Sequence, residues 1–122
     1  MAHVLVIDDD EEQRTLAREI LVRAGHGVED AADGDQGLRL FRKRRPDLVV
    51  TDINMPGIDG HAVISALRVM NKDVPIIAMS GGGAVEKDDL LLRAAVLGAT
   101  EVIMKPFEFR QLVGAVGRAV GR

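Results

Sequence analysis

Short apolar runs alternate with longer amphipathic stretches along the whole chain. The strongest runs, at residues 4–7, 48–50 and 76–79, are continuous and mostly β-branched. Such runs are typical of strands that are buried on both faces of a parallel sheet. A further run lies at residues 102–104, and a weaker candidate lies at residues 27–31. The pattern therefore indicates five strands with other elements between them.

The stretches between these runs have helical spacing. Apolar side chains recur there every three or four residues, so that each stretch would bury one face. The positions are Leu16, Ile20, Leu21 and Ala24, then Val63, Leu67 and Met70, and finally Phe109, Leu112, Val113, Val116 and Val120. Five strand–helix units predict an α/β fold of the (βα)5 type, with one open, doubly wound parallel sheet. No linker interrupts the pattern, and we expect a single domain over residues 1–122.

Composition narrows the range of functions. The 122 residues carry a net charge of −3 and include no cysteine, tryptophan or tyrosine. Disulfides and cysteine-ligated metals are excluded, and neither direct nucleic-acid binding nor attraction to acidic lipids is favoured. His3, His26 and His61 have no ligand spacing, and we expect them at the surface or in turns. Without a leader pattern or a long apolar run, a cytoplasmic protein that does not contact membranes is expected.

Polar side chains with useful chemistry follow four of the predicted strands. They are Asp8-Asp9-Asp10 after the first strand, Asp52 after the third, Ser80 after the fourth and Lys105-Pro106 after the fifth. In open α/β sheets, ligands bind beyond the carboxyl ends of the strands. We therefore expect these residues to meet at one edge of the sheet.

Clustered acids at this edge would raise one another's pKa values or bind a cation. Oxygen ligands without histidine or cysteine suit Mg²⁺, with Mn²⁺ as an alternative. Each residue alone also has an ordinary explanation, because Asp9 or Asp10 can cap a helix and Asp52 can belong to a turn. Together, the acids, the Ser80 hydroxyl and the Lys105 ammonium favour a phosphoryl-transfer site with a carboxylate nucleophile.

Four motifs occur in order along the chain. They are Val-Leu-Val-Ile-Asp-Asp at 4–9, Thr-Asp-Ile-Asn-Met-Pro-Gly-Ile-Asp-Gly at 51–60, Ala-Met-Ser-Gly at 78–81 and Lys-Pro-Phe at 105–107. In this order and spacing, the set resembles the receiver domains of two-component response regulators, close to the stand-alone chemotaxis type. The resemblance implies a flavodoxin-like sheet with strand order 2-1-3-4-5. It also implies a phosphoacceptor module of a two-component or phosphorelay system, and not a turnover enzyme.

The resemblance further implies an acceptor and a metal site. Asp52 would take the phosphoryl group from a sensor histidine kinase or a histidine phosphotransfer protein. Asp8, Asp9, Asp52 and the backbone carbonyl of Asn54 would hold Mg²⁺. The downstream protein partner is not identified, and a monomer or a weak phosphorylation-dependent dimer is expected.

Other positions would bind the phosphoryl group or transmit the signal. Ser80 and Gly81 would fill the switch position, Lys105 would pair with a phosphoryl oxygen, and the Lys105–Pro106 peptide would be cis. Partner binding would change on the face of helix four, strand five and helix five. Many family members have an aromatic residue three positions before the lysine, where this chain has Val102.

Three alternatives stay open beside the signalling module. A phosphohydrolase with an aspartyl nucleophile often has a second acid two residues later, where this chain has Asn54. A nucleotide or flavin binder would need a glycine-rich phosphate loop, and none follows the first strand. A scaffold without phosphorylation would not need the acidic set.

Overall fold

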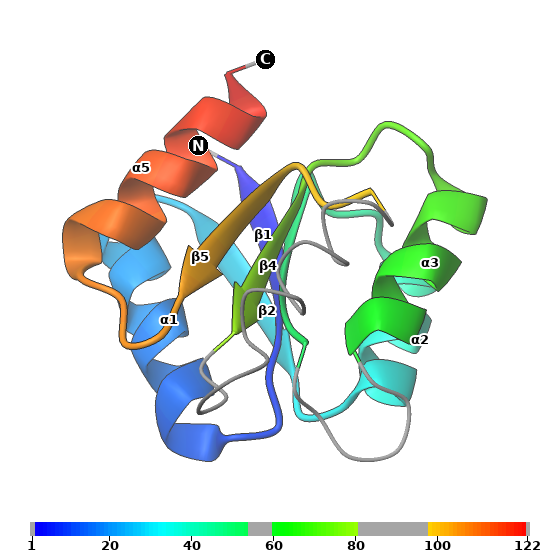
Figure 1. Cartoon of the computed structure of the whole chain (residues 1–122), viewed down its shortest axis with the longest axis horizontal. Helices are drawn as coiled ribbons and strands as arrows, with labels where there is room; N and C mark the ends of the chain where they lie inside the picture. Colours follow the sequence, from blue (N-terminus) through cyan, green and yellow to red (C-terminus); the bar gives the residue numbers. More distant parts are fainter. Residues whose placement is uncertain (1, 54–59, 81–97, 122) are drawn as a thin grey trace.

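The computed structural model describes residues 2–53, 60–80 and 98–121, which form a five-stranded parallel sheet between helices (Figure 1). The strands are β1 (His3–Ile7), β2 (Gly27–Ala31), β3 (Leu48–Asp52), β4 (Ile76–Ser80) and β5 (Glu101–Met104). The described helices are α1 (Glu11–Arg23), α2 (Gly34–Lys43), α3 (Gly60–Met70) and α5 (Phe109–Val120). The strand order is β2-β1-β3-β4-β5, which confirms the predicted fold class. The helix predicted between β4 and β5 lies outside the described residues.

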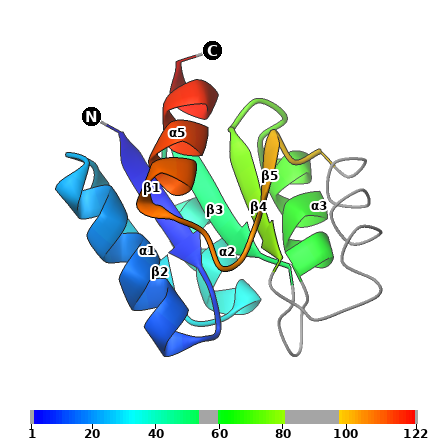
Figure 2. The same ribbon diagram turned by 60° about the vertical axis from the view of Figure 1, so that its left-hand side comes forward.

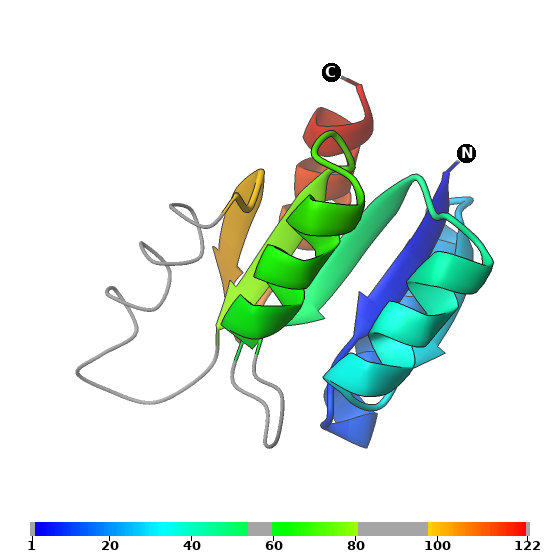
Figure 3. The same cartoon turned by 90° about the vertical axis from the view of Figure 1, so that its right-hand side faces the viewer.

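Helices cover both faces of the sheet, with α1 and α5 on one face and α2 and α3 on the other (Figures 2 and 3). Residues along β1 alternate between the two cores. Val4 and Val6 pack with α1 and α5, whereas Leu5 and Ile7 pack with α2 and α3. Every residue of β3 and of β4 is buried. Burial on both faces explains why these strands have continuous apolar sequences.

Arg68 fixes the edge of the sheet where β4 and β5 begin. Its Nε and Nη2 donate to the Gly98 carbonyl at 2.9 and 2.7 Å. Its Nη1 donates to the carbonyls of Val74 at 2.6 Å and of Asn71 at 3.2 Å. Burial lowers the pKa of Arg68 from its ordinary value, while Asp73 acts in the opposite direction. The guanidinium stays charged at any ordinary pH and ties the end of α3 to both strand entries.

The expectation that all three histidines lie at the surface or in turns is wrong for His61. This residue is only 8% exposed because it lies in the first turn of α3, on the same face as the core residue Ile64. His3 and His26 have partners near the start of β1. His3 Nε2 lies 3.1 Å from a Glu29 carboxylate oxygen, and His26 Nδ1 accepts from an Ala2 backbone N–H. In the part of the chain that the structure describes, no helix has the length and apolar character to cross a membrane.

Candidate functional site

The carboxyl ends of the strands bring polar residues together from distant parts of the chain. Asp8 follows β1, Asp52 ends β3, Ser80 ends β4 and Lys105 follows β5. The parallel pairings of β1 with β3, β3 with β4 and β4 with β5 align these ends at one edge of the sheet. The four residues thus come from four neighbouring strands, and the strand order determines which of them are adjacent.

Three carboxylates form the centre of this edge. One carboxylate oxygen from each of Asp8, Asp9 and Asp52 lies within 4.8 Å of the other two. Asp8 is fully buried and Asp52 is 5% exposed, whereas Asp9 is exposed. Two unit charges about 5 Å apart repel by about 3 kcal/mol at an effective dielectric constant of about 20. Positive charge beside the three carboxylates offsets this repulsion.

Lys105 supplies part of that charge. Its Nζ donates to Asp8 Oδ2 at 2.6 Å and lies 3.5 Å from Asp52 Oδ2. The lysine side chain is 12% exposed, so water screens these pairs only weakly. The Lys105 backbone N–H donates to the Ser80 carbonyl at 2.8 Å, and the Lys105–Pro106 peptide bond is cis. The ammonium therefore lies between two of the acids, and β5 is joined to the end of β4.

Residues 8–10 have separate structural surroundings although they are consecutive aspartates. Asp10 is the N-cap of α1, and its Oδ1 accepts from the Gln13 backbone N–H at 3.2 Å. Asp8 Oδ1 accepts from the Asp10 backbone N–H at 3.0 Å, and its Oδ2 accepts from Lys105 Nζ at 2.6 Å. The capping explanation considered from the sequence thus applies to Asp10.

The donor set fits a hard divalent cation. It consists of carboxylate oxygens, which are the ligands that Mg²⁺ and Mn²⁺ prefer. Three carboxylates (Asp8, Asp9 and Asp52) and one ammonium (Lys105) have a formal sum of −3 + 1 = −2. A single divalent ion would neutralise this sum. The exposed Asp9 leaves the cluster open to solvent on one side, so an ion can enter and keep bound water.

The remaining predicted site residues are only partly described. Ser80 is fully buried at the end of β4. Asn54 and Gly81 lie outside the described residues. Val102, in β5, is 37% exposed, and with Met104 it lines an open hollow between β5 and α5.

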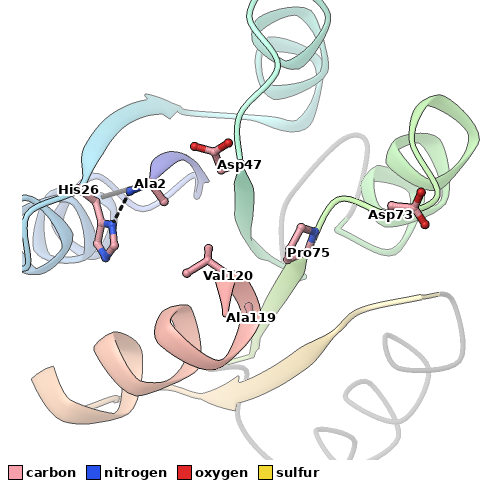
Figure 4. Close-up of a pocket in the computed structure, with 7 residues that line it drawn as sticks. All are labelled: Ala2, His26, Asp47, Asp73, Pro75, Ala119 and Val120. Carbon is pink, nitrogen blue, oxygen red and sulfur yellow. Dashed lines mark hydrogen bonds between the residues drawn. The ribbon is translucent and has the colours of Figure 1, made fainter. Parts of the chain in front are cut away.

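A larger hollow lies at the opposite edge of the sheet (Figure 4). It has a volume of about 550 Å³ and is lined by Ala2, His26, Asp47, Asp73, Pro75, Ala119 and Val120. Two of its polar groups bind the backbone at the start of the chain. His26 Nδ1 accepts from the Ala2 N–H at 3.1 Å, and Asp47 Oδ2 accepts from the His3 N–H at 2.8 Å. These two polar groups hold the start of the chain in place, and we therefore do not assign a reaction to this hollow.

Sequence reasoning missed Arg14, which contacts the acidic edge from α1. Its Nη1 donates to the Asp8 carbonyl at 2.9 Å. A signal existed, because Arg14 lies one helical turn after Asp10 at the start of a predicted helix. The reach of its side chain, however, depends on how α1 packs over β1, which the sequence pattern does not specify.

Comparisons with known proteins agree with this geometry. A model of the response regulator receiver domain family matches residues 4–117. The transcriptional regulatory protein PrrA of Mycobacterium tuberculosis is 40% identical over 113 residues, which cover 93% of this chain and 47% of PrrA. Sporulation initiation phosphotransferase F of Bacillus subtilis is 32% identical over 113 residues, or 93% of this chain and 89% of that protein.

The known structures include the chemotaxis protein CheY4 of Vibrio cholerae. It matches with a TM-score of 0.87 and 33% identity, over 98% of this chain and 98% of CheY4. The chain spans about half the length of PrrA and most of the length of phosphotransferase F. Because the family model covers nearly all of a sheet whose strand ends carry the acids and the lysine, this chain belongs to the response regulator receiver domain family.

Proposed function

We propose that residues 1–122 form one receiver domain that acts as the phosphoacceptor of a two-component or phosphorelay system. Asp52 accepts the phosphoryl group from a sensor histidine kinase or a histidine phosphotransfer protein, in the cytoplasm. The observation that carries this proposal is the position of the Asp52 carboxylate. It is nearly buried, clustered with Asp8 and Asp9, and 3.5 Å from Lys105 Nζ.

In the transfer step, a carboxylate oxygen of Asp52 attacks phosphorus and the phosphorus–nitrogen bond of the donor histidine breaks. The imidazole nitrogen keeps the electron pair of that bond and takes up a proton from water. The products are an acyl phosphate on Asp52 and an unmodified donor histidine. Because the group stays on the protein as a signal, we propose a signalling phosphoacceptor and not a turnover enzyme.

The other residues of the site hold charge around Asp52. Asp8, Asp9, Asp52 and the carbonyl of Asn54 would hold Mg²⁺, or Mn²⁺, and the bound ion supplies positive charge to the phosphoryl oxygens. Lys105 pairs with a phosphoryl oxygen once the Asp52 charge moves onto that group.

Ser80 and Gly81 form the proposed switch position. The Ser80 hydroxyl donates to the phosphoryl group, and Gly81 is the next residue in the sequence. The hydrogen bond from the Lys105 N–H to the Ser80 carbonyl supports this role, because it links the end of β4 to β5. A shift of Ser80 would therefore displace β5, the strand that contains Val102.

A groove between α1 and α5 supports docking of the donor protein beside the site. It has a volume of about 310 Å³ and is lined by Leu16, Glu19, Ile20, Arg23, Phe107 and Phe109. Leu16 is 42% exposed and Phe109 is 48% exposed. Phe107 follows Lys105 by two residues, so the groove begins next to the phosphoryl-binding lysine. Exposed apolar side chains with a charged rim suit a helical partner.

The β5–α5 face supports the proposed output. Its hollow has a volume of about 480 Å³ and is lined by Val102, Ile103, Met104, Gln111 and Arg118. Phosphorylation would shift the population of two arrangements of helix four, β5 and α5, and so change binding of a downstream protein. The protein is a monomer, or a weak dimer after phosphorylation, in this proposal. Val102 has no ring, so the output would not use an aromatic side chain at this position.

The mass of the intact protein after incubation with acetyl phosphate and Mg²⁺ tests the proposal. Wild-type protein gains the mass of one phosphoryl group, and Asp52→Asn gains none because an amide is not a nucleophile. The control is Asp47→Asn, which changes an exposed acid at the opposite edge and keeps the gain. Equal uptake by Asp52→Asn and wild type would show that Asp52 is not the acceptor.

A further inference from the structure

Arg14 binds the backbone at the acidic site. Its Nη1 donates to the Asp8 carbonyl oxygen at 2.9 Å. Its Nε lies 3.9 Å from Asp30 Oδ2, on β2. The Arg14 side chain is 18% exposed, in agreement with the position of α1 along β1 and β2 (Figure 2). The guanidinium therefore lies between the end of β1 and a carboxylate of the neighbouring strand.

The Asp8 carbonyl belongs to the peptide that joins Asp8 to Asp9. A peptide unit is planar, so a hydrogen bond to its oxygen fixes the orientation of the whole unit. That orientation sets the directions in which the side chains on both sides leave the backbone. The Asp8 N–H also donates to the Ala31 carbonyl at 3.1 Å. Arg14 and Ala31 thus hold the two sides of Asp8 at the point where β1 ends.

We propose that Arg14, supported by Asp30, is a positioning residue for the cation site. By holding the Asp8–Asp9 peptide, it directs both carboxylates towards the ion that they share with Asp52. This inference rests on the proposed function in one respect, namely that the three carboxylates bind a divalent cation.

The sign of the expected effect separates positioning from simple electrostatics. Arg14 is positively charged and close to the cluster, so removal of its charge alone would strengthen cation binding. Loss of the orientation of the Asp8–Asp9 peptide would instead weaken cation binding. Residues that orient metal ligands typically contribute tenfold or more to metal affinity. A weaker affinity in a variant that has lost a positive charge is therefore not explained by charge.

Arg18 provides a matched control on the same helix. Its Nη1 lies 3.4 Å from Asp30 Oδ2, but its side chain is 49% exposed. No hydrogen bond from Arg18 to the described backbone at Asp8 is present. Arg18→Met removes the same charge from the same partner and leaves the Asp8 carbonyl bonded to Arg14.

The test is Mn²⁺ binding to the metal-free whole chain, measured by electron paramagnetic resonance of the free ion. Arg14→Met binds Mn²⁺ about tenfold more weakly than wild type, and Arg18→Met stays within about twofold. Arg14→Gln, a polar variant that also lacks the positive charge, weakens binding in the same direction, and it decides the question if Arg14→Met does not fold. Circular dichroism melting of the metal-free variants identifies any unfolded protein.

Wild-type affinity in Arg14→Met, or in Arg14→Gln where Arg14→Met is unfolded, would overturn the role of Arg14 and leave the proposed function intact. A lower melting temperature with unchanged Mn²⁺ affinity would show a structural role only, and would also overturn the proposal. Failure of the wild-type chain to bind Mn²⁺ would overturn both the cation site and the role of Arg14.

Discussion

At the scale of single residues, surroundings decide what each aspartate does. Asp8 is fully buried and pairs with Lys105 at 2.6 Å. Asp9 is exposed and completes the carboxylate cluster. Asp10 is also exposed, and its side chain caps α1. Three identical side chains thus divide into an ion-paired acid, a cluster acid and a helix cap.

This division predicts that two neighbouring substitutions affect different properties, one the stability of the fold and the other the affinity for metal. Asp10→Ala removes the N-cap and lowers the free energy of unfolding by about 1 kcal/mol, with Mn²⁺ affinity unchanged. Asp9→Ala removes a ligand and one source of repulsion, so Mn²⁺ affinity falls while the metal-free protein stays at least as stable. Urea denaturation followed by circular dichroism and the Mn²⁺ titration measure the two effects. If both variants changed both quantities alike, the division would be wrong.

Only part of this division was accessible from the sequence. The sequence pattern identified Asp9 and Asp10 as possible caps, but it could not choose between them. The choice depends on where α1 begins, and helix boundaries are uncertain by a few residues in sequence-based reasoning. The reach of Arg14 to the Asp8 carbonyl depends on side-chain direction in the packed helix. The spacing of residues along the sequence determines neither the first residue of α1 nor the direction of the Arg14 side chain.

At the scale of elements, Gly98 and Gly117 show how differently two glycines can act. Gly98 precedes β5 and has a φ of +119°, with Arg68 Nε 2.9 Å from the position that a Cβ would take. Gly117 lies in α5, where a Cβ would meet no atom within 4 Å beyond its chain neighbours and the backbone of its own helix. The first glycine is needed for the backbone conformation and for the Arg68 contacts. The second only weakens its helix.

Alanine at the two positions therefore changes stability in opposite directions. Gly117→Ala raises the free energy of unfolding by about 1 kcal/mol, the usual difference between the two residues in a helix. Gly98→Ala lowers it by about 1–2 kcal/mol because alanine is strained at positive φ, and displacement of Arg68 adds to the loss. Urea denaturation measures both values. Stabilisation by Gly98→Ala would contradict the positive φ of Gly98 and its close contact with Arg68.

At the scale of the whole molecule, the (βα)5 pattern predicted the sheet because its central strands are buried on both faces. Even the weak candidate at 27–31 corresponds to β2 (Gly27–Ala31). The strand order, in contrast, was implied by the family resemblance, since apolar runs do not specify which strands are neighbours. His61 and Arg68 were not foreseen as structural residues, because their burial depends on how α3 packs on the sheet.

The carboxylate cluster at the strand ends also predicts that binding of a divalent ion stabilises the folded chain. A ligand that binds only the folded state adds about 2.7 kcal/mol at a hundred times its dissociation constant. Excess Mg²⁺ should therefore raise the melting temperature of the wild-type chain, and EDTA should reverse the effect. Asp9→Ala, which lacks a cluster carboxylate, should show little response. Equal Mg²⁺ responses of the two proteins would indicate binding elsewhere.

The position of the phosphoryl group after reaction tests the central claim most directly. Borohydride reduces an acyl phosphate on aspartate to homoserine, and peptide mass spectrometry then locates the changed residue. After treatment with acetyl phosphate and Mg²⁺, the account predicts homoserine at position 52 and unchanged aspartates at positions 8, 9 and 10. Protein that carried the phosphoryl group before reduction, but in which position 52 is still aspartate afterwards, would contradict the account.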